Sequence, residues 1–81
     1  MPAEVEFPFV SIATTYEGAS PEAVEREVTK KIEESVNSVE GVKRIFSYSN
    51  EAFSQVFIEF QLNTKIMDAT ADVRAKMDGI R

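Results

Sequence analysis

The sequence lacks both cysteine and histidine. Without cysteine the chain has no disulfide, no thiolate zinc site and no thiol nucleophile. Without histidine it lacks the usual general base near neutral pH, the commonest metal ligand and any Ser-His-Asp triad. These two absences remove the commonest catalytic and metal-binding side chains, and they leave only carboxylate, amine and hydroxyl groups for chemistry.

Positive charge is also scarce. The chain has nine Lys and Arg residues and 14 Asp and Glu residues, which gives a formal net charge of -5. Phosphate backbones repel such a surface unless its basic residues cluster. The densest basic pair, Lys30-Lys31, lies among Glu27, Glu33 and Glu34. Nucleic acid is therefore not an expected partner.

Long apolar runs are missing as well. No run approaches the ~20 residues that a membrane helix needs, and the acidic, proline-containing start lacks the pattern of a signal peptide. A chain of 81 residues holds one domain at most, with residues 1–6 as a lead-in. Since the sequence stops at Ile80-Arg81 directly after a helical pattern, we expect an excised fragment of a larger protein.

The first half of the chain has the pattern of a strand followed by a helix. Residues 9–16 alternate between two sides and are rich in β-branched residues, which predicts a half-buried strand. Gly18 allows a sharp turn, Ser20 can cap a helix, and Pro21 suits the first helical position. The predicted helix spans residues 21–38 and has one apolar stripe, formed by Val24, Val28, Ile32, Val36 and Val39.

The second half predicts a hairpin and another helix. Strands at residues 42–49 and 53–62 are joined by so short a connection that they should pair antiparallel. In the second of these strands one face carries Ser54, Val56, Ile58, Phe60 and Leu62. A helix is expected over residues 66–80, with an apolar stripe of Ile66, Ala69, Thr70, Val73, Met77 and Ile80.

This order of elements defines the expected fold class. The succession β-α-β-β-α is one strand short of the ferredoxin-like split β-α-β sandwich. Crossover rules then place the third strand between the first and the second, in a three-stranded antiparallel sheet. We expect an α+β fold with both helices on one face and the first strand at an open edge.

The sequence gives little support for a metal site, an anion site or an acylphosphatase-type active site. Asp68 and Asp72 are four residues apart, but two carboxylates are too few for a hard metal ion without a partner chain. The helix start after Gly18 could present N–H groups to an anion, but Glu17 and Glu22 lie beside it. The acylphosphatases that share this sandwich use an arginine in that loop, and this loop has none.

The outer sheet face is more informative. Phe53, Gln55 and Phe57 lie opposite the core face of their strand. If Ile45 points inward, Phe46 and Tyr48 join them on an exposed aromatic surface, and large apolar patches usually mark a contact with a partner or ligand. The alternative is that the strand twists and buries these rings locally.

One ordered set of residues resembles a known family. The run from Val10 to Glu25, VSIATTYEGASPEAVE, is similar to the start of the first periplasmic porter region of resistance-nodulation-division (RND) efflux transporters. The similarity continues through residues 39–45 and 71–76 and covers essentially the whole chain. It is greatest for the AcrB-like multidrug branch. Three departures from the family pattern are Glu17, where the family usually has proline, Lys65, where aspartate is typical, and the pair Phe46 and Tyr48, where small hydroxyl residues are common.

The resemblance implies a role within a larger assembly. The parent would be a proton-driven inner-membrane exporter of amphiphilic compounds, a homotrimer that works with a periplasmic adaptor and an outer-membrane channel. Residues 1–81 would be a single porter subdomain in its periplasmic portion. It would not be an enzyme, and it would have no catalytic residue, no metal site and no cofactor. The outer sheet face would line the substrate cleft or meet a neighbouring subdomain, through Ala13, Thr15, Phe46, Tyr48, Phe53, Gln55 and Phe57.

The resemblance also assigns a role to the second helix. It would be the pore helix, and its axis-facing residues would be Met67, Asp68, Ala71, Ala75 and Asp78. The alternative is a free-standing α+β module that binds a ligand or a protein. In either case the open strand edge and the aromatic face favour self-association of the isolated chain.

Overall fold

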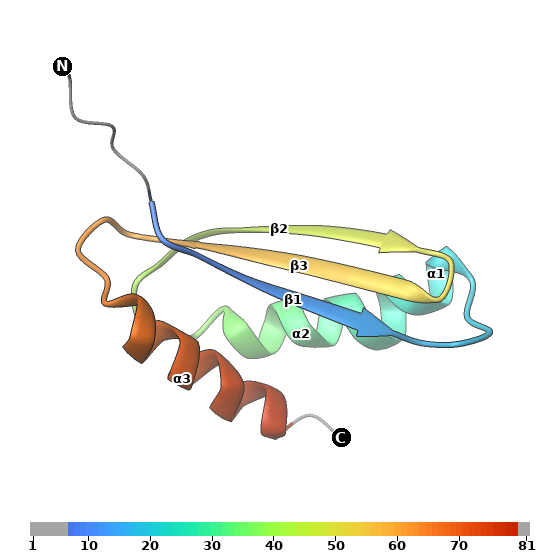
Figure 1. Cartoon of the computed structure of the whole chain (residues 1–81). Coiled ribbons are helices and arrows are strands. Elements are labelled where there is room, and N and C mark those ends of the chain that lie inside the picture. Colours follow the sequence, from blue (N-terminus) through green and yellow to red (C-terminus); the bar gives the residue numbers. More distant parts are fainter. Residues whose placement is uncertain (1–6, 80–81) are drawn as a thin grey trace, which may run out of the picture.

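The computed structural model describes residues 7–79, which form three strands and two helical segments (Figure 1). The first helical segment is divided into two α-helical parts around a π-helical part. In chain order the elements are β1 (Phe9–Thr15), α1 (Pro21–Val24), η1 (Glu25–Thr29), α2 (Lys30–Val36), β2 (Val42–Asn50), β3 (Phe53–Phe60) and α3 (Ile66–Asp78). This succession confirms the predicted order of strands and helices.

The sheet has the order β1-β3-β2, and both pairings are antiparallel. β3 is therefore the central strand, as the crossover rule predicted. Figure 1 shows the helices on the same side of this sheet, and no described element covers the other side. The α+β arrangement of a three-stranded antiparallel sheet with helices on one face is confirmed.

The core lies between β3 and the helices. On the inner face of β3, Ser54, Val56, Ile58 and Phe60 are all buried, as their alternation predicted. The helices bring Ile32, Val36, Ala69 and Val73 onto this face, and Val39 joins them from the following loop.

Two residues expected on the core side are instead exposed. Leu62 is 53% exposed because β3 ends at Phe60 and the chain turns away. Ile66 is 42% exposed; it is the first residue of α3 and lines an open depression on that helix. Ile80, the last residue of the predicted stripe, lies outside the described residues.

The first helix differs from a regular α-helix. Residues 25–29 form a π-helical turn, which adds one residue to the helical repeat. As a result the buried positions run Val24, Thr29, Ile32 and Val36, while Val28 is only partly buried. The stripe predicted from the sequence includes Val28 and not Thr29, so it is wrong in omitting Thr29 and only partly right about Val28.

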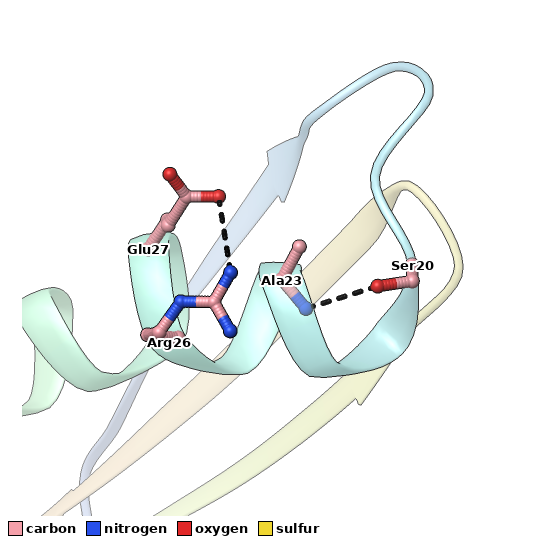
Figure 2. Close-up of polar contacts among 4 residues, drawn as sticks. All are labelled: Ser20, Ala23, Arg26 and Glu27. Atoms are coloured by element: carbon pink, nitrogen blue, oxygen red, sulfur yellow. Dashed lines mark hydrogen bonds and ion pairs between the residues drawn. The ribbon is translucent and has the colours of Figure 1, made fainter.

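The helix start follows the sequence prediction. Ser20 Oγ accepts a hydrogen bond from the Ala23 backbone N–H at 3.2 Å (Figure 2). Pro21 occupies the first helical position. One turn later, Arg26 and Glu27 form an exposed ion pair at 4.0 Å. The exposed pair adds little stability, so the cap and the buried stripe define this helix.

Candidate functional site

The outer sheet face carries side chains from all three strands in regular rows. The register places Ala13 and Tyr48 on either side of Gln55, and Thr15 and Asn50 on either side of Phe53. A third row joins Ser11, Phe57 and Phe46. The seven residues proposed from sequence for this face therefore lie together, in three adjacent rows.

The aromatic rings of these rows are substantially exposed. Tyr48 is 58% exposed, Phe46 40% and Phe53 36%, while Phe57 and Gln55 are half-buried. Tyr48 and Phe57 make an edge-to-face contact with ring centroids 6.0 Å apart and planes at 77°. The alternative in which the strand buries these rings locally is not what the structure shows, and an apolar surface of this kind is typical of a contact surface.

The direction of β2 explains why these rings face outward. Ile45 pairs with Ile58 and packs against the core, so Phe46 and Tyr48 point to the other side. A bulge between Val42 and Arg44 then turns Val42 back toward the core. Ile45 therefore points inward, which is the condition under which the sequence predicts Phe46 and Tyr48 on the outer face.

A charged pair forms one end of the aromatic face. Arg44 Nε lies 2.7 Å from Glu59 Oε1, and the guanidinium carbon of Arg44 is 5.9 Å from the centroid of the Phe46 ring. Phe9, which is 51% exposed, flanks Glu59 on the other side. Sequence alternation placed Glu59 and Phe9 on the outer faces of their strands, but the ion pair depends on the register between strands and was not predicted.

The residues proposed for the outer face of α3 are all exposed. Met67 is 82% exposed, and Asp68, Ala71, Ala75 and Asp78 are exposed as well, whereas Ala69 and Val73 are buried on the other side. Met67 and Ala71 line a shallow, largely apolar depression of about 310 Å³ together with Ile66, Thr70 and Arg74. The helix thus presents a free face with an apolar strip at its N-terminal end.

Two of the three acidic residues of α3 line a different depression. Asp68 and Asp72 line a second open depression of about 360 Å³, together with Glu40 and Lys65. Among residues 7–79 no group of three or more carboxylates is close enough to hold a metal ion. Nor does any helix in this range have both the length and the apolar character to cross a bilayer.

The chain matches the AcrB/AcrD/AcrF family over residues 1–81, and it belongs to this family. It is 34% identical over 77 residues to the swarming motility protein SwrC of Bacillus subtilis, a match that covers 95% of this chain. It is 32% identical over 75 residues to the multidrug resistance protein MdtC of Photorhabdus laumondii and to that of Enterobacter sp., and each match covers 93% of this chain.

These matches confirm the family assignment made from the sequence, which is that of AcrB-like RND multidrug transporters. The chain spans 7% of the length of each of these three relatives.

Proposed function

We propose that this chain is one porter subdomain, on the periplasmic side of the inner membrane, of a proton-driven RND efflux transporter for hydrophobic and amphiphilic compounds. It carries out no chemistry of its own. It supplies a rigid wall that moves with its neighbours within a homotrimer, which in turn works with a periplasmic adaptor and an outer-membrane channel. Family membership and the multidrug-resistance names of the MdtC relatives support this proposal.

The observation that carries the proposal is the open aromatic sheet face. Three exposed rings and the half-buried Phe57 lie on a side of the sheet that no described element covers. The amide of Gln55 lies among them and can donate and accept hydrogen bonds. Flat aromatic surfaces with few fixed polar groups suit loose binding of varied amphiphilic molecules. In our proposal this face lines the substrate cleft.

The free face of α3 supports the second half of the proposal. Small and apolar side chains at Ala71, Ala75 and Met67 allow close approach of another helix, and their exposure leaves them available to one. In our proposal this face lies toward the three-fold axis, where it meets the same helix of neighbouring protomers. Asp68 and Asp78 then lie beside the axis, in contact with water.

The role of the sheet face is tested by Phe57→Ala in the full-length transporter. We expect an altered resistance spectrum, measured as the inhibitory concentrations of several chemically different compounds, at unchanged expression. Leu62→Ala is the matched control, because Leu62 is a similarly large apolar residue, 53% exposed, that lies beyond the end of β3. A spectrum unchanged in Phe57→Ala would remove this residue from the cleft.

The role of α3 is tested by disulfide trapping, for which the absence of native cysteine in this chain is an advantage. In a full-length transporter freed of other cysteines, Ala71→Cys should give oxidised dimers of protomers. Lys30→Cys, an exposed position on the other helical segment, should not. Equal cross-linking at both positions, or none at Ala71, would contradict the axial position of α3.

The alternative function is a free-standing module that binds a ligand or protein through the same face. The two proposals differ in what accompanies the chain. Proteomic detection of these 81 residues within a membrane-embedded polypeptide supports the transporter, whereas a separate small product supports the module.

A further inference from the structure

Four polar side chains connect the π-helical turn to the end of the β2–β3 hairpin. Thr29 Oγ1 lies 2.8 Å from Ser49 Oγ and 2.7 Å from Ser54 Oγ. Ser49 Oγ in turn lies 2.7 Å from Glu25 Oε2. Ser49 and Ser54 are register partners on adjacent strands, so Thr29 bridges the two strands at their inner face.

The direction of each hydrogen bond among these four side chains follows from the number of protons that each can donate. An ionised glutamate only accepts, so Ser49 donates its single hydroxyl proton to Glu25. The Ser49 oxygen must then accept from Thr29. Thr29 has no second proton, so its oxygen accepts from Ser54. The hydrogen bonds therefore run one way, from Ser54 through Thr29 and Ser49 to Glu25.

Burial makes Thr29 the critical member of this row of hydrogen bonds. Thr29 is 0% exposed and Ser54 is 1% exposed, so neither hydroxyl can exchange its partner for bulk water. If the Thr29 oxygen were removed, the buried Ser54 proton would lose its acceptor, and an unpaired buried donor costs more than a typical hydrogen bond contributes on balance. Glu25 and Ser49 lie nearer the surface and are less sensitive.

The π-helical turn places Thr29 at this point. Its extra residue brings position 29 into the buried stripe between Val24 and Ile32. The same turn carries Glu25 at its beginning, beside β2. Both ends of the turn are thus attached to the hairpin.

We propose that Thr29 is a positioning residue, the pivot of a one-way hydroxyl chain that holds the end of the β2–β3 hairpin against the first helix. This role goes beyond the transport function proposed above and does not depend on it. Its consequence for the outer face is direct, because Tyr48, Phe53 and Gln55 are the chain neighbours of Ser49 and Ser54. A hairpin end that opens would displace these three side chains.

The test compares Thr29→Val, which keeps the shape and removes the hydroxyl, with Thr29→Ser, which keeps the hydroxyl and removes a methyl group. Thr29→Val should lower the folding equilibrium constant roughly 5- to 150-fold, as expected for an orphaned buried donor. In amide hydrogen exchange, protection at residues 49–54 should fall further than protection at Ile45 and Ile58. Thr29→Ser should retain the hairpin-end protection despite some loss of overall stability.

Three further measurements make the result decisive even if Thr29→Val does not fold. Thr29→Val combined with Ser54→Ala should recover most of the lost stability, since no buried donor remains unpaired. Thr70→Val is the matched control, because within residues 7–79 its hydroxyl bonds only to the Ile66 carbonyl of its own helix. In the unaltered chain the Thr29 and Ser54 hydroxyl protons should give slowly exchanging NMR signals.

The proposal would be overturned if the unaltered protein gave no slowly exchanging signals for the Thr29 and Ser54 hydroxyl protons. Equal hairpin-end protection in Thr29→Val and Thr29→Ser, or additive effects of the Thr29 and Ser54 substitutions, would also overturn it.

Discussion

Arg44 and Glu59 form an ion pair across β2 and β3, with 2.7 Å between Nε and Oε1, and the two side chains differ greatly in exposure. The Arg44 side chain is 53% exposed, whereas that of Glu59 is 11% exposed. The pair therefore compensates a nearly buried carboxylate at the end of the aromatic face. Removing Arg44 would leave a nearly buried charge unpaired, whereas removing Glu59 would leave only an exposed one.

Replacing Arg44 should consequently destabilise the fold. Arg44→Met keeps the apolar stem but leaves the Glu59 carboxylate without its partner. We expect a loss of about 1–2 kcal/mol in the free energy of unfolding, a value reduced because Arg44 is half exposed. Urea denaturation measures this loss. Arg26→Met, which breaks the exposed 4.0 Å pair with Glu27, is the control and should change stability by less than about 0.5 kcal/mol.

Adding Glu59→Gln to Arg44→Met should restore part of the lost stability, because the amide has no charge to leave unpaired. An Arg44→Met variant as stable as Arg26→Met would show that the pair does not compensate the buried carboxylate.

Gly41 is the second point at which a single change has a defined physical cost. It has φ +88°, and an added Cβ would lie 2.6 Å from Thr64 Oγ1. Gly18 has a similar φ of +80°, but no described atom lies within 4 Å of the added Cβ. Gly18→Ala should therefore cost about 1 kcal/mol from backbone strain alone, and Gly41→Ala should cost clearly more.

Thr64→Ala should remove the difference between the two glycine positions. It deletes the hydroxyl and methyl groups nearest to the added carbon and leaves Thr64 Cβ at 3.5 Å. In thermal unfolding, Gly41→Ala measured in a Thr64→Ala background should then cost as much as Gly18→Ala. An unchanged Gly41→Ala penalty in that background would refute steric conflict with Thr64.

The β1 edge of the sheet leads to a prediction about association. Residues 9–15 contain no charged residue, no proline and no bulge, which are the features that usually protect an edge strand. The opposite edge, β2, carries Lys43, Arg44 and a bulge. We expect the 81-residue chain to self-associate in sedimentation experiments as its concentration rises.

Ser11→Lys should weaken that association, since it places a charge on the exposed side of the unprotected edge. Asn50→Lys, at an exposed position on β2, is the control and should leave association unchanged. A chain that stays monomeric at high concentration, or one equally affected by both substitutions, speaks against pairing through β1.

The fold was largely predictable because its elements have clear periods. In β3, alternation assigned Val56 and Ile58 to the core and Phe57 to the outer face, and the structure agrees. The π-helical turn was not predictable, since Val28 fits an ordinary helical stripe better than Thr29 does. Thr29 is buried because it satisfies two serines that are distant in sequence, and no local pattern reports such a contact.

The candidate site was predictable only as a set of faces. Parity placed Tyr48 and Phe46 with Phe57 once Ile45 was assigned to the core, and tertiary packing decided that assignment. The ion pair between Arg44 and Glu59 depends on the register between two strands, which the sequence of either strand alone does not determine. What contacts these faces in the assembled transporter stays a prediction.

The most direct test of the central proposal is photo-cross-linking from the sheet face in the full-length transporter. A photoreactive phenylalanine analogue replaces Tyr48, the most exposed ring of the face, and as a control replaces Lys30 on the first helical segment. We expect a covalent adduct with a labelled amphiphilic export substrate at position 48, competed by excess unlabelled compound, and no adduct at position 30. Equal labelling at both positions, or an adduct at position 48 only with another part of the transporter, would contradict the cleft role of this face.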